Sequence, residues 1–284
     1  MIRKSILIFI ALSFFSVCFA GSIQDMHKAA IARKNAASSS IDYSQDASCE
    51  GAYRMNVTNA TEPDISVNSI DLAQNGGDMP TNADDPYTEA SGVSRDFYVD
   101  QCLNVNDAGS GDLDISGDPA LFSIVAWFKN ETIVNTEVQT IVAKWDEGGT
   151  ADKQYHVAIK GSATDEFAIR GRVSANGTDD VTVVSTATNY LDDTWYHVAI
   201  VGNDTDLRIY INGTLDSSAT TAHTTGIVDG DADFQIGGQG LPTGIAYAFD
   251  GLIDEVGVFS RALSATEVSN IYTDGLFGDN GSGD

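Results

Sequence analysis

The 284-residue sequence predicts an all-β fold, a two-sheet antiparallel sandwich with one short C-terminal helix. From about residue 48 to residue 277, short runs rich in Val, Ile, Thr and aromatic residues are separated by Gly, Asn and Asp, a pattern typical of strands and turns. About a dozen such runs exceed what one flat sheet carries, so two packed sheets are expected. No internal repeat is present, and we therefore predict one domain.

Residues 1–20 have the layout of a secretory signal peptide. Arg3 and Lys4 precede an apolar run, and Ala20 supplies the small residue before the expected cleavage. The run is shorter than the roughly 20 apolar residues of a membrane span, so no transmembrane segment is expected in the mature chain. Lipidation of Cys18 is a weaker alternative, because Val17 is bulky. We expect a secreted, extracellular or cell-surface protein, with the periplasm as an alternative.

Residues 21–47 differ in composition from the rest of the chain. The Ala-rich, charge-balanced part is compatible with a short helix or a disordered lead, and the Ser-rich part that follows is typical of a linker. The domain is predicted to cover residues 48–277, and residues 278–284 to form a flexible tail. The lead is a candidate docking segment for a surface protein.

The net charge narrows the possible binding partners, and the cysteine content limits the possible disulfides. The formal net charge is −26, and loss of Arg3 and Lys4 with the signal peptide makes it more negative. Nucleic acid is excluded as a partner, since binding it requires basic patches. Cys49 and Cys102 are left after cleavage, and an exported protein can join such a pair as a disulfide or keep two buried thiols.

The predicted strands follow one another at short spacing. In chain order they are Glu50–Met55, Phe97–Val105, Phe122–Phe128, Gln139–Trp145, Gln154–Lys160, Glu166–Val173, Asp180–Ser185, Trp195–Val201, Asp206–Ile211, Asp233–Gly237 and Gly251–Phe259. The dipeptide Asn212-Gly213 follows the run that ends at Ile211 and predicts a tight hairpin, because both residues tolerate positive φ.

The last strand leads into the predicted helix. In Gly251–Phe259, alternation places Asp254 and Glu255 on opposite faces. Ser264 and Glu267 have the spacing of a capping box, which starts a helix, and Gly275 is suited to ending it. An apolar stripe on this helix can dock on the sandwich.

Four stretches in order resemble one family, the LamG-like (laminin-G-type) jelly roll of the concanavalin A-like lectin/glucanase superfamily. They are SRDFYVDQCLNVND, LDISGDPALFSIVAWFKN, TWYHVAIVGNDTDLRIYINGTL and FDGLIDEVGVFSRALSATEV. The resemblance implies an all-β, two-sheet antiparallel jelly-roll sandwich, the first stretch being an early strand pair. It also implies a domain that binds extracellular glycans or proteins, often with calcium as cofactor.

Catalysis is not expected. Glucanases of the superfamily use closely spaced carboxylates on one face of a strand, whereas Asp254 and Glu255 are predicted to face opposite ways. No Ser-His-Asp or Cys-His arrangement is apparent either, so no residue is assigned a catalytic role. His156 and His197 lie in predicted strands, where a structural role is expected. A glycoside hydrolase is the least favoured alternative.

The resemblance implies calcium ligands near one rim of the domain. Asp254 and Asp250 are the late candidates, and Asp71 and Asn68 the early ones. For Asp254 the alternative is a structural carboxylate that accepts backbone N–H bonds or pairs with Arg261. Asp112–Gly117 matches the first half of an EF-hand loop, but Ser123 stands where the final Glu is required, so no EF-hand is predicted.

Aromatic residues outside the strands are the candidates for ligand binding. Tyr247 and Tyr190 lie in predicted loops and could contact a sugar, whereas the three tryptophans are expected to pack within the sheets. The sequence thus predicts a non-catalytic module that recognises a polysaccharide or glycoprotein. A structural or adhesive protein that contacts surface proteins is the alternative.

Overall fold

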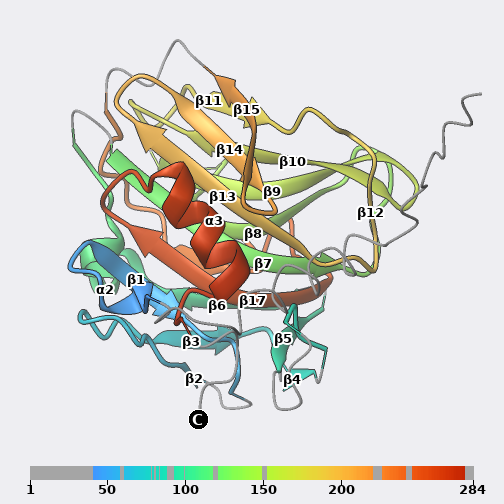
Figure 1. Cartoon of the computed structure of the whole chain (residues 1–284), viewed down its shortest axis with the longest axis horizontal. Helices are drawn as coiled ribbons and strands as arrows, with labels where there is room; N and C mark the ends of the chain where they lie inside the picture. Colours follow the sequence, from blue (N-terminus) through green and yellow to red (C-terminus); the bar gives the residue numbers. More distant parts are fainter. Residues whose placement is uncertain are drawn as a thin grey trace, which may run out of the picture.

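The computed structural model describes residues 41–57, 61–77, 79, 81–82, 84–87, 93–98, 100–117, 121–148, 152–219, 226–240 and 245–278. These residues form a jelly-roll sandwich of two antiparallel sheets, A and B, as the sequence predicts (Figure 1). The expected signal peptide and most of the lead lie outside the described residues. Within those residues, no helix combines the length and apolar character needed to cross a bilayer.

Sheet A forms one layer. Its strand order is β15 (Thr214–Ala219), β14 (Leu207–Ile211), β13 (Tyr196–Asn203), β7 (Leu121–Asn130), β17 (Gly251–Phe259), β5 (Ser94–Phe97) and β4 (Thr81–Asn82), and β1 (Cys49–Tyr53) also pairs with β17. β17 therefore links the first and last parts of the domain.

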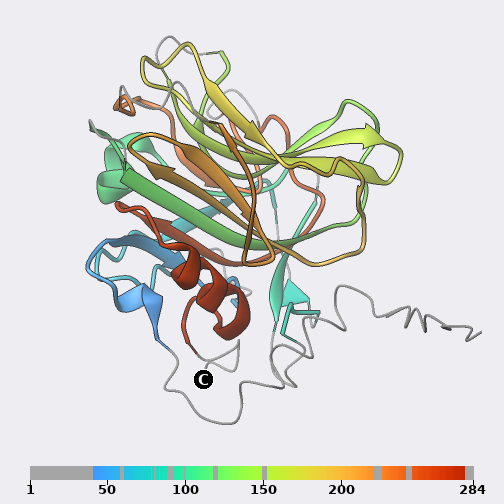
Figure 2. The same cartoon turned by 45° about the horizontal axis from the view of Figure 1, so that its top comes forward.

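Sheet B forms the second layer. Its order is β11 (Val181–Val184), β10 (Glu166–Val173), β9 (Lys153–Ala163), β8 (Val138–Trp145), β16 (Phe234–Ile236), β6 (Cys102–Val105), β3 (Leu72–Asn75) and β2 (Thr61–Glu62), and β12 (Tyr190–Leu191) also pairs with β10. In Figure 2 this sheet lies on the side of the sandwich away from helix α3 (Ala265–Asp274).

The core between the sheets follows from strand alternation. On β9, Tyr155, Val157 and Ile159 point inward and are fully or almost fully buried, while the residues between them face away from the core. On β10 the inward position Gly171 lies against Ile200 of sheet A, where an added Cβ would come within 2.5 Å of the Ile200 Cδ1. Close packing of the two sheets therefore requires a residue without a side chain at this position.

One predicted strand is divided in two. The run Phe97–Val105 forms the end of β5 in sheet A and all of β6 in sheet B. Asp100, between them, has φ 68°, and the Tyr98 N–H donates to the Gln101 side chain at 3.0 Å. The turn moves the chain from one sheet to the other, as the early strand pair of the family resemblance implies.

Local signals elsewhere are confirmed. Asn212 and Gly213 have φ of 49° and 76° and connect β14 to β15. The capping box of α3 is complete: the Glu267 N–H donates to Ser264 Oγ, and the Ser264 N–H donates to the Glu267 carboxylate at 2.7 Å. The helix ends at Gly275, as predicted.

The outer side of sheet A is covered by both ends of the domain. Helix α3 packs Val268 and Ile271 onto this face (Figure 1). Residues 41–47, predicted as linker, belong to the domain: a 3-10 helix, η1 (Tyr43–Gln45), buries Tyr43 in the same cluster, and the Tyr43 N–H donates to Leu276 O at 2.8 Å. The domain therefore begins earlier than predicted, because its first turn pairs with the end of the chain.

Candidate functional site

The acidic pair of β17 lies at a β-bulge. Asp254 is opposite Trp127 and Gly257 is opposite Val125, so β17 has one residue more than β7 between these points. Glu255 takes φ 44°, an uncommon conformation for a residue with a side chain. The extra residue breaks the alternation, and the predicted placement of Asp254 and Glu255 on opposite faces is wrong.

Both carboxylates face the outer side of sheet A. Asp254 lies opposite Trp127, which packs in the outer cluster with Tyr87. The Glu255 Oε2 accepts hydrogen bonds from the Tyr87 hydroxyl and from the Leu276 N–H, both at 2.9 Å. The next residue, Val256, returns to the core between the sheets.

The pair is enclosed and structural in character. Asp254 is 5% exposed and Glu255 3%. Burial, followed by the charge of Glu255, raises the pKa of Asp254 well above its ordinary value. The Asp254 Oδ1 accepts from the Glu255 N–H at 2.8 Å, which is the backbone role considered for it. It does not pair with Arg261, which binds Asp46 and Glu267 instead.

The four predicted calcium ligands do not converge. Asn68 donates to Glu50 at 2.7 Å, and Asp71 accepts from the Asp64 N–H at 3.0 Å. Asp250 is held by its backbone, which accepts from the Glu131 N–H at 2.9 Å, whereas Asp254 is buried at the bulge. Among the residues that the structure describes, no group of three or more His, Cys, Asp or Glu is placed to hold a metal ion. The residues expected to bind calcium therefore do not fit it.

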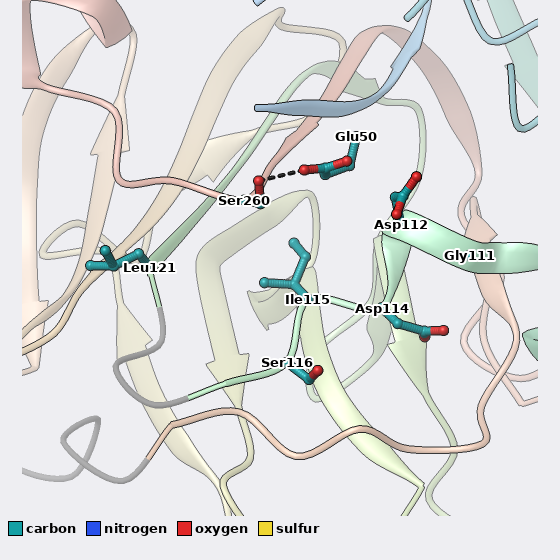
Figure 3. A pocket seen from close by; sticks show the side chains of 8 residues that line it. All are labelled: Glu50, Gly111, Asp112, Asp114, Ile115, Ser116, Leu121 and Ser260. Atoms are coloured by element: carbon teal, nitrogen blue, oxygen red, sulfur yellow. Dashed lines mark hydrogen bonds between the residues drawn. The ribbon is translucent and has the colours of Figure 1, made fainter. Parts of the chain in front are cut away.

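An open pocket lies where β1, the end of β17 and the start of β7 meet (Figure 3). Its volume is about 370 Å³, and it is lined by Glu50, Gly111, Asp112, Asp114, Ile115, Ser116, Leu121 and Ser260. This volume is within the range of small-molecule sites, roughly 300–1,000 Å³. The segment after the short helix α2 (Asp107–Ser110) forms one wall, through the 3-10 helix η2 (Gly111–Leu113) and the residues that follow it.

Two neighbours fix the Glu50 carboxylate at the pocket. The Ser260 hydroxyl donates to it, as the dashed line in Figure 3 shows, and the Asn68 amide donates to its other oxygen at 2.7 Å. Asn68 thus supports a pocket residue in place of the metal role expected of it. Glu50 and Ser260 meet only because β1 pairs with β17, so no local sequence signal could have indicated the contact.

The wall of the pocket is held by a buried lysine. The Lys144 Nζ lies 2.7 Å from Asp114 and 2.6 Å from Asp107, and it also donates to the carbonyl of Ala232 at 2.6 Å. Burial raises the pKa of Asp114, and the contact with Lys144 opposes that rise. Because Lys144 is fully buried, the charged groups lining the pocket itself are carboxylates. The sequence pattern Asp112, Asp114, Ser116 was the one available signal for this wall.

The two tyrosines predicted to bind ligand are in different settings. Tyr247 is 46% exposed, with φ 51°, and its carbonyl accepts from the Thr140 N–H of β8. Tyr190 is part of β12, and its ring packs on Phe167 and Tyr196 at centroid distances of 6.0 and 5.0 Å. Its expected loop position is wrong, and its ring serves mainly to cover the core. The three tryptophans are buried, as predicted.

Cys49 and Cys102, the two cysteines in the described part of the chain, are free and buried. Cys49 packs in the cluster outside sheet A, and Cys102 lies in sheet B beside Leu103, which points into the core. Cys102 therefore faces the outer side of sheet B, and the core separates the two thiols. Of the two alternatives, the disulfide is wrong in this structure. Burial raises the pKa of Cys102 to about 12, which keeps the thiol protonated.

Several solved structures share the fold of this chain. Domain 4 of AbnA, a GH43 extracellular arabinanase from Geobacillus stearothermophilus solved with arabinotriose, matches with a TM-score of 0.54 and 17% identity, over 79% of this chain and 98% of that domain. The binding domain of Paraclostridial Mosquitocidal Protein 1 matches with a TM-score of 0.57 and 15% identity, over 78% of this chain and 52% of that one.

A third similar structure is the binding domain of botulinum neurotoxin DC in complex with rat synaptotagmin II, with a TM-score of 0.52 and 16% identity, over 79% of this chain and 51% of that one. This chain spans about half the length of the toxin domains. At these identities the likeness shows the fold alone. No curated protein sequence matches the chain. The family model of the concanavalin A-like lectin/glucanases superfamily matches residues 107–269, more than half of the chain, which therefore belongs to this laminin-G-type family.

Proposed function

We propose that this protein is a secreted, non-catalytic module that binds an extracellular glycan or the glycan of a glycoprotein through the Glu50–Ser260 pocket. The observation that carries the proposal is the set of oxygen groups around this cavity, with Glu50 held in place by Asn68 and Ser260. Carboxylates held in this way can accept hydrogen bonds from sugar hydroxyls without first losing side-chain freedom.

The charge and shape of the pocket indicate the type of glycan. Glu50, Asp112 and Asp114 disfavour an anionic ligand, so a neutral sugar is expected. Ile115 and Leu121 provide an apolar surface for the C–H face of a sugar ring. The arabinotriose complex of a domain with this fold is consistent with a short neutral oligosaccharide as ligand.

Two features favour binding over hydrolysis. The adjacent acids of β17 are covered by Tyr87 and by the segment after α3, so a polysaccharide has no access to them. In the pocket, Glu50 already accepts hydrogen bonds from two side chains. Both of its oxygens are thus engaged as acceptors, which is the role that binding of sugar hydroxyls uses. Calcium is not assigned a role, because the residues expected to hold it do not converge.

The test is a screen of neutral plant, algal, bacterial and host glycans, followed by titration calorimetry with the best ligand. Asp112→Ala should weaken binding by about tenfold or more, since it removes an exposed acceptor that has no hydrogen-bond partner among the described residues. Glu166→Ala, an acidic residue on β10 away from the pocket, is the matched control. The proposal would be overturned if the protein bound no glycan of the panel, or if Asp112→Ala and Glu166→Ala bound the best ligand equally well.

Two further measurements complete the test. If a glycoprotein binds and enzymatic removal of its glycans leaves the affinity unchanged, a protein surface is the ligand and the glycan assignment fails. Secretion is tested by the intact mass of exported protein, which should correspond to cleavage after Ala20. A full-length mass in the exported fraction would contradict that part of the proposal.

A further inference from the structure

The outer face of sheet B carries cations in a strongly acidic protein, whose net charge is −26. On β9 and β10 the inward positions hold core residues, so Lys160, Arg170 and Arg172 project from the opposite face. This side of the sandwich faces away from helix α3 (Figure 2). It shares no residue with the pocket.

The two arginines of β10 differ in their partners. Arg172 lies 2.8 Å from Glu147 and 3.0 Å from Asp180, and its guanidinium stacks on Trp145 at 4.3 Å from the ring centroid. Arg170 makes no hydrogen bond or ion pair with the described part of the chain, and its Nε is buried without a partner. Burial, followed by the charge of Arg172, lowers the pKa of Arg170. The charges of Glu147 and Asp180 oppose this shift, but both carboxylates are bound to Arg172 and neither forms an ion pair with Arg170.

The register shows what surrounds Arg170. Ala158 of β9 and Val184 of β11 are directly opposite it, and Ala158 is in turn opposite Thr140 of β8. The Thr140 N–H donates to the Tyr247 carbonyl at 2.8 Å, which holds Tyr247 at the far end of this row. The exposed Val184 thus lies next to Arg170, and the exposed Tyr247 lies at the other end of the same row, with Thr140 and Ala158 between it and the cation.

A second buried group on the same face has an unused polar atom. His156, beside Ala158 on β9, is 1% exposed and lies opposite Arg172. Its Nε2 is 3.0 Å from the Thr140 hydroxyl, while its Nδ1 has no partner among the described residues. Glu147 and Asp180 are the carboxylates that act on both Arg170 and His156, and both of them are bound to Arg172. A buried polar atom without a protein partner requires an explanation, such as a bound water or ion.

We propose that Arg170 and Tyr247 form a second binding site, which takes an anionic polysaccharide by its carboxylate or sulfate group. The guanidinium fork matches either oxyanion with two parallel hydrogen bonds, and the Tyr247 ring can stack on the neighbouring sugar. The acidic remainder of the protein does not prevent this, since charges farther than about 8 Å are largely screened at physiological ionic strength. A nucleic acid would require a longer row of unpaired cations than this face offers.

The experiment compares charged glycans with their neutral counterparts, using the full chain. Oligogalacturonate is set against its methyl ester, and dextran sulfate against dextran, in titrations at low and at physiological salt. Wild-type protein should bind at least one charged form more than about tenfold tighter than its neutral partner. A preference for oligogalacturonate over its methyl ester indicates a carboxylate as ligand, and a preference for dextran sulfate over dextran indicates a sulfate. Raising the salt should weaken this binding.

Three variants test the residues. Arg170→Gln should remove the preference for the charged glycan, and Tyr247→Ala should weaken binding of the same probe. Arg208→Gln, which removes the same charge from sheet A, should leave it unchanged. Circular dichroism and unchanged binding of a neutral pocket ligand confirm that each variant is folded. Wild-type affinity in Arg170→Gln, or equal binding of charged and neutral probes by the wild type, would overturn the second site and leave the pocket proposal standing.

Discussion

Replacing Glu255 by alanine should destabilise the domain, because its carboxylate joins three parts of the chain. The Glu255 Oε2 accepts from the Leu276 N–H and from the Tyr87 hydroxyl, both at 2.9 Å. After the substitution Tyr87 can still donate to Ile271 O, which lies 3.4 Å away, but the Leu276 N–H loses this buried acceptor. One orphaned donor and the cavity left by the side chain together cost about 2–5 kcal/mol.

Urea unfolding followed by tryptophan fluorescence is the suitable assay. Trp127 donates to the Tyr87 hydroxyl at 2.5 Å and packs edge-on against its ring, so its emission reports on this region. Glu255→Gln keeps the shape and one acceptor oxygen and is the matched control, expected to lose less than Glu255→Ala. A loss below about 1 kcal/mol for Glu255→Ala, within the range of ordinary surface changes, would refute the structural role of the bulge.

Replacing the neighbouring acid, Asp254, should have the opposite effect and increase the stability of the domain at higher pH. Burial and the charge of Glu255 raise the folded-state pKa of Asp254 above 3.8, so the folded protein holds a proton that the unfolded chain releases. Stability on this account falls as pH rises above about 3.8. Asp254→Asn keeps an oxygen for the Glu255 N–H and removes the charge. The variant should therefore gain stability relative to wild type as pH increases, and a constant difference between pH 4 and pH 8 would contradict this reasoning.

Three other predictions concern packing, pH and metal. Gly171→Ala should lower the free energy of unfolding in urea by about 1–3 kcal/mol, because the added methyl group overpacks against Ile200. Adding Ile200→Val should restore part of this loss. An equal loss in the double variant would show that Ile200 is not the obstacle. Burial raises the pKa of Asp192 to about 6, so its contribution to stability falls as pH rises from about 4 to 6. Asp192→Asn should therefore melt at a higher temperature than wild type at pH 8 and at the same temperature near pH 4. Identical melting curves of the two proteins at both pH values would contradict this prediction. EDTA should leave glycan binding unchanged, since Asp254, Asp250, Asp71 and Asn68 lie apart; loss on chelation with recovery on adding calcium would show a metal site elsewhere.

Much of the fold could be predicted because its signals are local. Alternation within β7, β9, β10 and β13 shows which residues face the core between the sheets, and the Asn212-Gly213 turn and the capping box of α3 each depend on a few neighbouring residues. The family resemblance adds order and spacing over the whole domain. Trp127, Trp145 and Trp195 were correctly expected to be buried for the same reason.

The sites depend on pairing between distant segments, which alternation cannot show. The bulge at Asp254 and Glu255 arises where β17 pairs with β7 under the cover of Tyr87, and it reverses the expected direction of one side chain. The pocket brings Glu50 to Ser260, which is 210 residues away in the sequence.

The sequence by itself determined the fold class, the main strands and the terminal helix, since these follow from periodicity and capping within short windows. Only the tertiary structure decided which carboxylates are buried, which line the pocket, and that Arg170 forms no ion pair with the described residues while Arg172 forms two. The physical reason is that burial and charge pairing are properties of a residue's neighbours in space, and strand register and sheet packing choose those neighbours.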